Sequence, residues 1–315
     1  MNAGNKGIAL SFQSISPGNV SSLRCLSSVR FGWVSRLRWS PGGDKLAICG
    51  GDGIAIYVNG FGGAPTFRLR DHTAPVKDIA FSPNGKLLAS ASADMTIVLY
   101  TVARNQAHVL KTLPSHTGSV EALAFSPDGE LLASGGADNT VRLWSAETGA
   151  QVELLAGHAD EVTTLCFANA GSHLYSAGRD GVVRCWARKS GFQSEILGSH
   201  DDWIRQIAFQ PGSATLASAG RDMMIRLWRL DDRARPLVWP AHAGGVDALA
   251  FSPDGALMAS GGRDNAIRVW DVDSARELMT LSAHRRPVLA LDFNPAGTML
   301  ASGAGDNQVM LWAVN

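Results

Sequence analysis

The stretch that decides the fold runs from Ser115 to Trp144 and reads SHTGSVEALAFSPDGELLASGGADNTVRLW. Its histidine recurs through most of the chain in steps of 44, 42, 42, 42 and 42 residues. The histidines in phase are His72, His116, His158, His200, His242 and His284. Self-similarity at this period indicates one supersecondary unit stacked on copies of itself.

Two other residue types keep the same spacing. An aspartate precedes an aromatic residue by six positions in every copy. The aspartates are Asp94, Asp138, Asp180, Asp222, Asp264 and Asp306. The aromatic residues are Tyr100, Trp144, Trp186, Trp228, Trp270 and Trp312. Agreement in phase at several positions is far more specific than any single residue, so the repeat is the basis of the predicted fold.

Each copy predicts four short strands and a tight turn. In the copy quoted above, the strands are expected at 120–125, 131–134, 140–145 and 151–155, with the turn Ser-Pro-Asp-Gly at 126–129. Proline presets φ at the second turn position, and glycine supplies a positive φ. Short runs of β-branched and aromatic residues between Gly, Pro, Asn and Asp are typical of strands. No stretch shows a helical period with caps, so essentially no helix is predicted.

A degenerate copy precedes the six regular ones. Arg30 occupies its histidine position, because Trp39 follows at the spacing of the corresponding aromatic residue elsewhere. This copy keeps Asp52 but has Ile48 where the others have serine and Tyr57 or Val58 where they have tryptophan. The chain therefore contains seven units.

The two ends of the chain carry different expectations. Residues 1–19 are rich in Ser, Asn and Gly without a sustained period, so we expect a flexible N-terminal tail. Residues 20–315 are expected to form a single domain, because the period leaves no room for a second one.

Units of about 42 residues with four strands resemble the WD-repeat family. The dipeptides of that family stand intact at Gly157-His158 and Trp270-Asp271 and are half kept elsewhere. The resemblance covers residues 21–315 and implies an all-β, seven-bladed β-propeller of four-stranded antiparallel blades. The last unit ends on its third strand, so the run at 21–27 is expected to supply the fourth strand and close the ring, which removes an exposed edge.

Composition argues against several classes of partner. The formal net charge is zero, so no global field draws the protein to nucleic acid or to an anionic membrane. No apolar run approaches the ~20 residues needed to span a bilayer. The four cysteines show no CxxC spacing, so we expect buried free thiols and a reducing compartment, and we predict a cytoplasmic protein without a cofactor or metal.

The repeated histidine, aspartate and serine could be mistaken for a hydrolase triad. The family resemblance implies instead a structural network, in which the imidazole contacts the aspartate and a strand serine, and the serine also contacts the tryptophan. An enzyme needs one special site rather than six equivalent ones, so we expect a non-catalytic protein.

Positions that vary between copies are where function should lie. Arginines directly precede the aspartate in three consecutive units, and a tryptophan and an arginine follow the histidine of one of them. In the family these positions emerge on one side of the ring, which we call the top rim. The candidate partner-binding residues are Trp203, Arg205, Arg179, Arg221, Arg263, Trp33 and Arg285. Tryptophan and arginine dominate binding energy at protein interfaces.

We therefore predict an interaction scaffold or adaptor that presents this rim to a protein or peptide partner, as a monomer or within a hetero-complex. Two alternative interpretations of these arginines remain open. In the first, the arginines pair with acidic neighbours such as Glu161 and Asp247; in the second, the arginine-lined mouth of the channel senses a small ligand or a phosphate.

Overall fold

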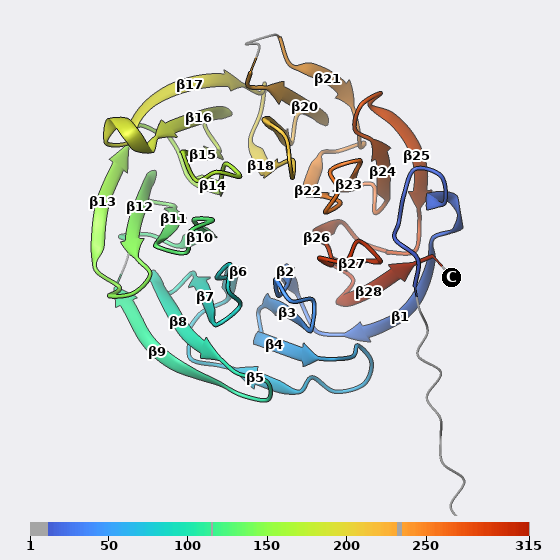
Figure 1. Ribbon diagram of the computed structural model, residues 1–315, viewed down its shortest axis with the longest axis horizontal. Coiled ribbons are helices and arrows are strands. Elements are labelled where there is room, and N and C mark those ends of the chain that lie inside the picture. The colour runs from blue at the N-terminus through green and yellow to red at the C-terminus, as the bar shows by residue number, and fades with distance from the viewer. Residues whose placement is uncertain (1–11, 115, 232–234, 315) are drawn as a thin grey trace, which may run out of the picture.

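Seven four-stranded antiparallel sheets form a closed ring in the computed structural model, which describes residues 12–114, 116–231 and 235–314 (Figure 1). In the described residues, helix is limited to two 3₁₀ turns, η1 (Val20–Ser22) and η2 (Arg188–Ser190). None of the described helices is long and apolar enough to span a membrane. The structure confirms the predicted seven-bladed, all-β propeller.

In the first six blades the strands follow chain order from the channel to the outer wall, whereas the outermost strand of the seventh blade is β1. The first blade contains β2 (Val34–Trp39), β3 (Lys45–Gly50), β4 (Gly53–Val58) and β5 (Phe67–Leu69). The second contains β6 (Val76–Phe81), β7 (Leu87–Ser92), β8 (Thr96–Val102) and β9 (Ala107–Pro114). The third contains β10 (Val120–Phe125), β11 (Leu131–Gly136), β12 (Thr140–Ser145) and β13 (Gln151–Ala156).

The remaining blades repeat this plan. The fourth contains β14 (Val162–Phe167), β15 (His173–Gly178), β16 (Val182–Ala187) and β17 (Gln193–Ser199). The fifth contains β18 (Ile204–Phe209), β19 (Thr215–Gly220), β20 (Met224–Arg229) and β21 (Leu237–Pro240). The sixth contains β22 (Val246–Phe251), β23 (Leu257–Gly262), β24 (Ile267–Asp271) and β25 (Arg276–Leu281). The seventh contains β26 (Val288–Phe293), β27 (Met299–Ala304), β28 (Gln308–Ala313) and β1 (Arg24–Arg30).

The N-terminal strand closes the ring, as predicted. β1 pairs antiparallel with β28, so the first and the last strand of the chain lie side by side in the seventh blade (Figure 1). The strand lies a few residues later than the expected 21–27, and Arg30 is its last residue, opposite Gln308. Arg30 therefore belongs to the closing strand as well as to the position where the other copies carry a histidine.

The packed part of the chain begins before residue 20. Gln13 forms a bridge with Val314, and the backbone N–H of Ile15 donates to the carbonyl of Gly297 at 2.8 Å. Ile15 is 2% exposed and lies in a cluster with core residues of the sixth and seventh blades. We expected residues 1–19 in a flexible tail, but residues 12–19 pack against the last blades. The rest of the expected tail, residues 1–11, lies outside the described residues, and so does Ser115 of the quoted repeat.

The core is divided between neighbouring blades. One cluster joins Ala89 and Ile97 of the second blade to Leu123 and Trp144 of the third. Small residues on the second strand of each blade permit this packing, since a Cβ on Gly135 would come within 2.6 Å of the Val162 side chain of the next blade. The cysteines are unpaired, but only three of the four are covered, because Cys25 is exposed on the outermost strand β1.

One β-bulge recurs in every blade and shapes the channel. The pairing of the first two strands shifts after the first residue of the inner strand, so one residue per blade stands outside the ladder. These residues are Ser35, Lys77, Glu121, Thr163, Arg205, Asp247 and Leu289. A bulge re-aims the side chain that it carries, and all seven line the mouth of the channel.

Candidate functional site

The repeated polar residues form the expected network inside the blades. In the third blade, His116 Nδ1 lies 2.7 Å from an Asp138 carboxylate oxygen and His116 Nε2 lies 2.8 Å from Ser134 Oγ. Trp144 Nε1 donates to the same hydroxyl at 2.9 Å. The network ties the loop that enters the blade to the turn between its second and third strands.

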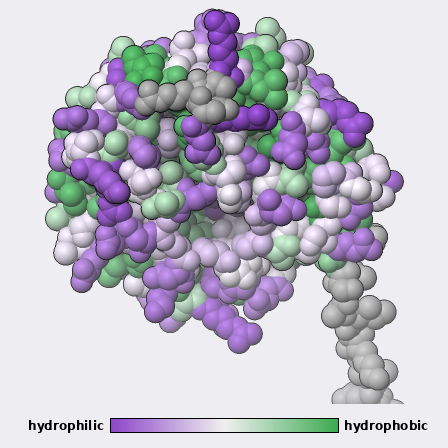
Figure 2. Space-filling view, turned by 45° about the horizontal axis from the view of Figure 1, so that its top comes forward, coloured by the Kyte–Doolittle hydropathy of each residue, from purple (hydrophilic) through white to green (hydrophobic). Residues whose placement is uncertain are grey.

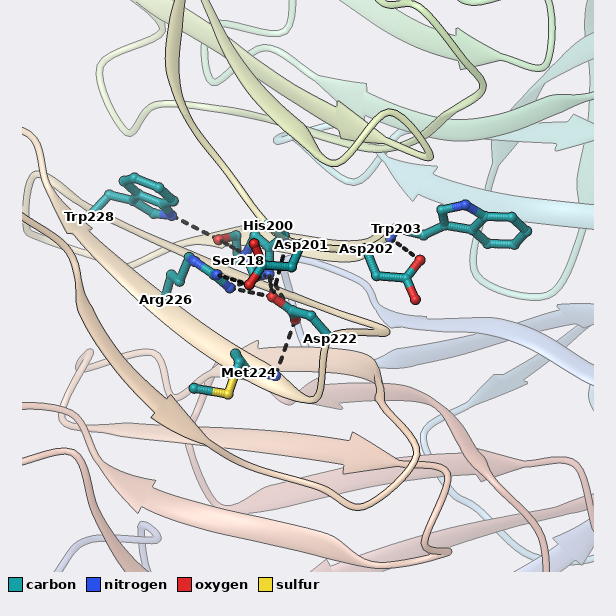
Figure 3. A network of polar contacts seen from close by, with 9 residues as sticks. All are labelled: His200, Asp201, Asp202, Trp203, Ser218, Asp222, Met224, Arg226 and Trp228. Carbon is teal, nitrogen blue, oxygen red and sulfur yellow. Dashed lines mark hydrogen bonds and ion pairs between the residues drawn. The ribbon is translucent and has the colours of Figure 1, made fainter.

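The same arrangement holds in the fifth blade, where Arg226 joins it (Figure 3). Burial lowers the pKa of His200 below its usual value, and the Asp222 carboxylate beside it only partly offsets this effect. Burial alone would raise the pKa of Asp222, but hydrogen bonds from His200 and Arg226 outweigh it and hold the pKa at about 2. The pair therefore consists of a neutral imidazole and a charged carboxylate at neutral pH.

Equivalent copies make this network a framework. Histidine contacts both aspartate and serine in six blades. Tryptophan donates to the serine in five of them. No group of three or more potential metal ligands gathers within the described ranges. The arrangement stabilises turns and offers no single site that differs from the rest.

The variable positions of the top rim are joined by a backbone bond in all seven blades. The residue before the aspartate position donates its N–H to the carbonyl of the residue three after the histidine position. In the fifth blade, for example, the Arg221 N–H donates to the Trp203 carbonyl at 2.9 Å. The sequence repeat therefore aligned these positions correctly.

Trp203 is the centre of the candidate site. The Arg179 guanidinium carbon lies 4.4 Å from the centroid of the Trp203 ring, and that of Arg221 lies 4.3 Å from it. The indole thus lies between two cations from neighbouring blades, in contacts typical of cation–π pairs. Its side chain points away from the buried network of its own blade (Figure 3). We call these three residues the Arg–Trp–Arg stack.

Acidic residues neutralise part of this charge. Asp247 is almost fully buried, and its carboxylate lies 3.1 Å from Arg205 Nε and 3.1 Å from Arg263 Nε. Arg179 pairs with Glu161 at 3.1 Å. The sequence left open whether the arginines pair with acidic neighbours. Such pairs are present for Arg179, Arg205 and Arg263, but not for Arg221.

Arg221 differs from the other three. Within the described residues, its guanidinium makes no hydrogen bond to an acceptor and no ion pair, although the Trp203 ring holds it in place. Guanidinium presents five N–H donors in a planar fork. Arg221 thus carries the donors that remain open for a partner.

The structure separates two predicted residues from this group. Trp33 is 46% exposed at the mouth of the channel, where it lines a cavity of about 110 Å³ together with the bulge residues. Arg285 is exposed, and its backbone N–H donates to Asp306 at 2.9 Å. In the described residues, no ion pair or hydrogen bond joins the side chain of either residue to the Arg–Trp–Arg stack.

A buried bridge across the channel was missed at the sequence level. Arg36 Nε donates to Asp78 at 3.2 Å, and Arg36 Nη1 donates to Gln206 of the fifth blade. All three side chains are buried. The corresponding positions of other blades hold small residues such as Ala122 and Ala248, and that contrast was the available signal. The bridge occupies the channel below its mouth.

The surface carries no single dominant apolar patch on the face that Figure 2 shows. Hydrophobic residues lie there in separate small groups among hydrophilic ones (Figure 2). Among the described residues, the most exposed large hydrophobic residue is Ile196 at 60%. Scattered apolar residues are normal for a soluble surface and do not mark a docking site, so the polar top rim remains the candidate.

Comparison with known proteins identifies the repeat. The family model described as "WD domain, G-beta repeat" matches residues 63–101, 107–145, 149–187, 191–229, 235–271 and 275–313. The chain is also 40% identical over 87 residues to "Probable cytosolic iron-sulfur protein assembly protein Ciao1" of Culex quinquefasciatus, which covers 26% of this chain and 25% of that protein.

A second curated relative gives a similar result. The chain is 39% identical over 71 residues to "Probable cytosolic iron-sulfur protein assembly protein CIAO1 homolog" of Caenorhabditis elegans, which covers 20% of this chain and 21% of that protein. The chain therefore spans a quarter or less of the length of these curated relatives in the two alignments.

Proposed function

Because this chain belongs to the WD-repeat family, we propose that it is a non-catalytic interaction scaffold that binds a protein partner at its top rim. The observation that carries the proposal is the Arg–Trp–Arg stack. Trp203 and Arg221 are partly exposed, held in fixed positions and not consumed by the blade framework. Preorganised aromatic and arginine side chains lose little entropy on binding and are typical anchors of interfaces.

The same geometry disfavours the competing small-anion site. Arg205 and Arg263 share Asp247, and Arg179 is paired with Glu161, so the mouth of the channel carries less free positive charge than the sequence suggested. The cavity there is also lined by Glu121. A phosphate would meet carboxylates as well as cations at this place.

The relatives support an adaptor role without naming its partner. Both are named as probable cytosolic proteins of iron–sulfur protein assembly. We extend to this chain a cytoplasmic location and a role in holding other proteins together, and no more, because the shared segments are short parts of both proteins.

A capture experiment tests the proposal. The wild-type protein and the double variant Trp203→Ala with Arg221→Ala are immobilised and exposed to native lysate of the source cells. We expect a stoichiometric partner band for the wild type and its loss for the double variant, at unchanged melting temperature. Trp33→Ala is the matched control, because it removes an exposed rim tryptophan outside the stack. Equal capture by the double variant would move the site elsewhere.

A further inference from the structure

The channel contains a second cavity on the side of the ring opposite the top rim. This bottom chamber has a volume of about 400 Å³, and residues at the ends of the innermost strands line it together with prolines of the turns that follow. Gln206 also lines it, whereas Arg36, its hydrogen-bond partner in the buried bridge, lines the small cavity at the channel mouth. The bridge therefore lies between the two cavities.

The next-to-last residue of each innermost strand determines the character of the chamber. Five blades place a small side chain at this position, and all five line the chamber: Ala80, Ala124, Cys166, Ala208 and Ala250. The first and seventh blades, which are neighbours in the ring, instead place Arg38 and Asp292 there. Small side chains leave room between the blades, and the two charged residues face that room from one side.

Both charged side chains keep unused hydrogen-bonding groups. Asp292 accepts from the Trp39 backbone N–H at 2.8 Å through Oδ2, and in the described part of the chain its Oδ1 has no hydrogen-bond partner. Arg38 donates from Nη1 to the Leu37 carbonyl at 3.3 Å, and its side chain makes no other hydrogen bond there. Both residues are partly accessible, and among the described residues no ion pair joins them. The chamber thus presents a separate donor and a separate acceptor.

The charges of the chamber match a ligand that carries both signs. Burial raises the pKa of Asp292 to about 6, and the positive charge of Arg38 acts against that rise, so the carboxylate is charged at neutral pH. An anion without a cationic group would meet this carboxylate, and a cation without an anionic group would meet the guanidinium. A mostly apolar cavity of this size with few polar groups is typical of small-molecule sites.

We propose that the bottom chamber binds a free α-amino acid with an apolar side chain. Its carboxylate accepts from the Arg38 guanidinium, and its ammonium group donates to Asp292 Oδ1, both in charge-assisted hydrogen bonds. Its side chain lies against the alanines and against aromatic residues that line the chamber, such as Phe209 and Phe251. This site goes beyond the proposed function and does not depend on it, because the bridge separates it from the top rim.

Ligand analogues test both charges on the wild-type protein. Isothermal titration calorimetry compares L-leucine and L-phenylalanine with N-acetyl-L-leucine, which lacks the ammonium charge, and with L-leucinamide, which lacks the carboxylate. We expect both amino acids to bind and each analogue to bind about tenfold more weakly or less, because each loses one charge-assisted contact. Equal binding of either analogue, or no binding of the amino acids at millimolar concentration, would overturn the inference.

Substitutions test whether the amino acid lies in the chamber. Arg38→Met and Asp292→Asn should each weaken binding of L-leucine about tenfold or more. Asp292→Asn keeps an oxygen for the Trp39 N–H, so it removes the charge without removing that contact. Lys77→Met is the matched control, because it removes a cation that lines the cavity on the other side of the bridge, and it should leave binding unchanged.

Two results would contradict the assignment to the chamber. Weakening by Lys77→Met as large as that by Arg38→Met would place the amino acid at the channel mouth. Unchanged binding in both Arg38→Met and Asp292→Asn would show that neither charge contacts the ligand.

Discussion

At the residue scale, neighbouring positions of one repeat hold either a framework residue or a proposed binding residue. His200 and Asp222 lie inside a buried network. Trp203, three residues after His200, and Arg221, directly before Asp222, project from the rim. Internal hydrogen bonds satisfy the buried pair, so changing it should affect stability rather than recognition. The rim residues should behave in the opposite way.

Removing one framework carboxylate should therefore destabilise the protein. In Asp180→Ala, His158 and the Ala159 N–H lose their acceptor. Leaving the buried His158 donor unpaired costs about 1–3 kcal/mol, and we expect a fall in melting temperature of several degrees. Differential scanning calorimetry checks this, with Asp201→Ala as control because the Asp201 side chain is 95% exposed. An unchanged melting temperature for Asp180→Ala would remove the structural role of the network.

The framework also predicts loss of stability in acid. Burial lowers the folded-state pKa of His116, His200, His242 and His284, and hydrogen bonds hold the pKa of Asp222 at about 2, so the unfolded chain binds more protons in both cases. Stability then rises with pH. We expect the melting temperature to fall as pH drops below about 6.5, where unfolded histidine titrates, and again below about 4, where unfolded aspartate does.

Two groups oppose this trend. Burial raises the pKa of Asp292 to about 6 and also raises the pKa of Glu161, so their protonation favours the folded state as the pH falls. We expect the four histidines to outweigh them. Melting curves between pH 7 and pH 4 test whether stability falls in acid. A melting temperature that stayed constant or rose on acidification would contradict the prediction.

At the scale of the element, β-bulges shape the mouth of the channel and the N-terminal strand completes the seventh blade. The bulge in each innermost strand directs one side chain per blade to the mouth of the channel. The borrowed strand β1 gives the seventh blade its fourth member, and Ile15, Val20 and Leu23 before it are buried against the sixth and seventh blades. Closure thus involves more of the N-terminal chain than one strand.

Deleting residues 1–30 should therefore open the ring. The deletion leaves β28 with an unpaired edge and removes four buried aliphatic side chains, including Val29, each of which contributes about 1.5–3 kcal/mol. We expect a larger loss of melting temperature than from any single substitution, together with concentration-dependent aggregation in light scattering. Deleting residues 1–11 is the control. Unchanged stability of the longer deletion would contradict a role of β1 in closure.

At the scale of the whole molecule, a buried charge bridge joins distant blades. Arg36 contacts Asp78 of the neighbouring blade and Gln206 of the fifth blade across the channel, and Asp78 also accepts from the Leu123 N–H of the third blade. The bridge therefore links four blades. It occupies the channel, so a partner at the top rim can enter only the shallow mouth.

Removing one partner of this bridge should lower the free energy of unfolding. Arg36→Met leaves the Asp78 carboxylate buried without its cation, which typically costs about 3–5 kcal/mol. The double variant Arg36→Met with Asp78→Asn should recover a large part of that loss, because no buried charge is left unpaired. Equilibrium unfolding in urea for the four members of the cycle measures the coupling, and additive losses would show that the bridge is not coupled.

The sequence by itself determined the repeat, and the repeat determined much of the rest. Because each unit buries its apolar side chains only against its neighbours, a period of 42 residues with matched turns specifies strands, blade number and ring closure. The same phase placed Arg179, Trp203 and Arg221 on one rim. Local periodicity is visible in a string of residues, so these features could be predicted.

Only the tertiary structure decided how particular side chains share space. Arg36 and Gln206 lie 170 residues apart and meet because the ring brings opposite blades together across a narrow channel. Packing between blades also gave Arg205 and Arg263 a common carboxylate and, among the described residues, left Arg221 without one. Such contacts depend on distances between blades, and a repeat states the order of residues but carries no distances.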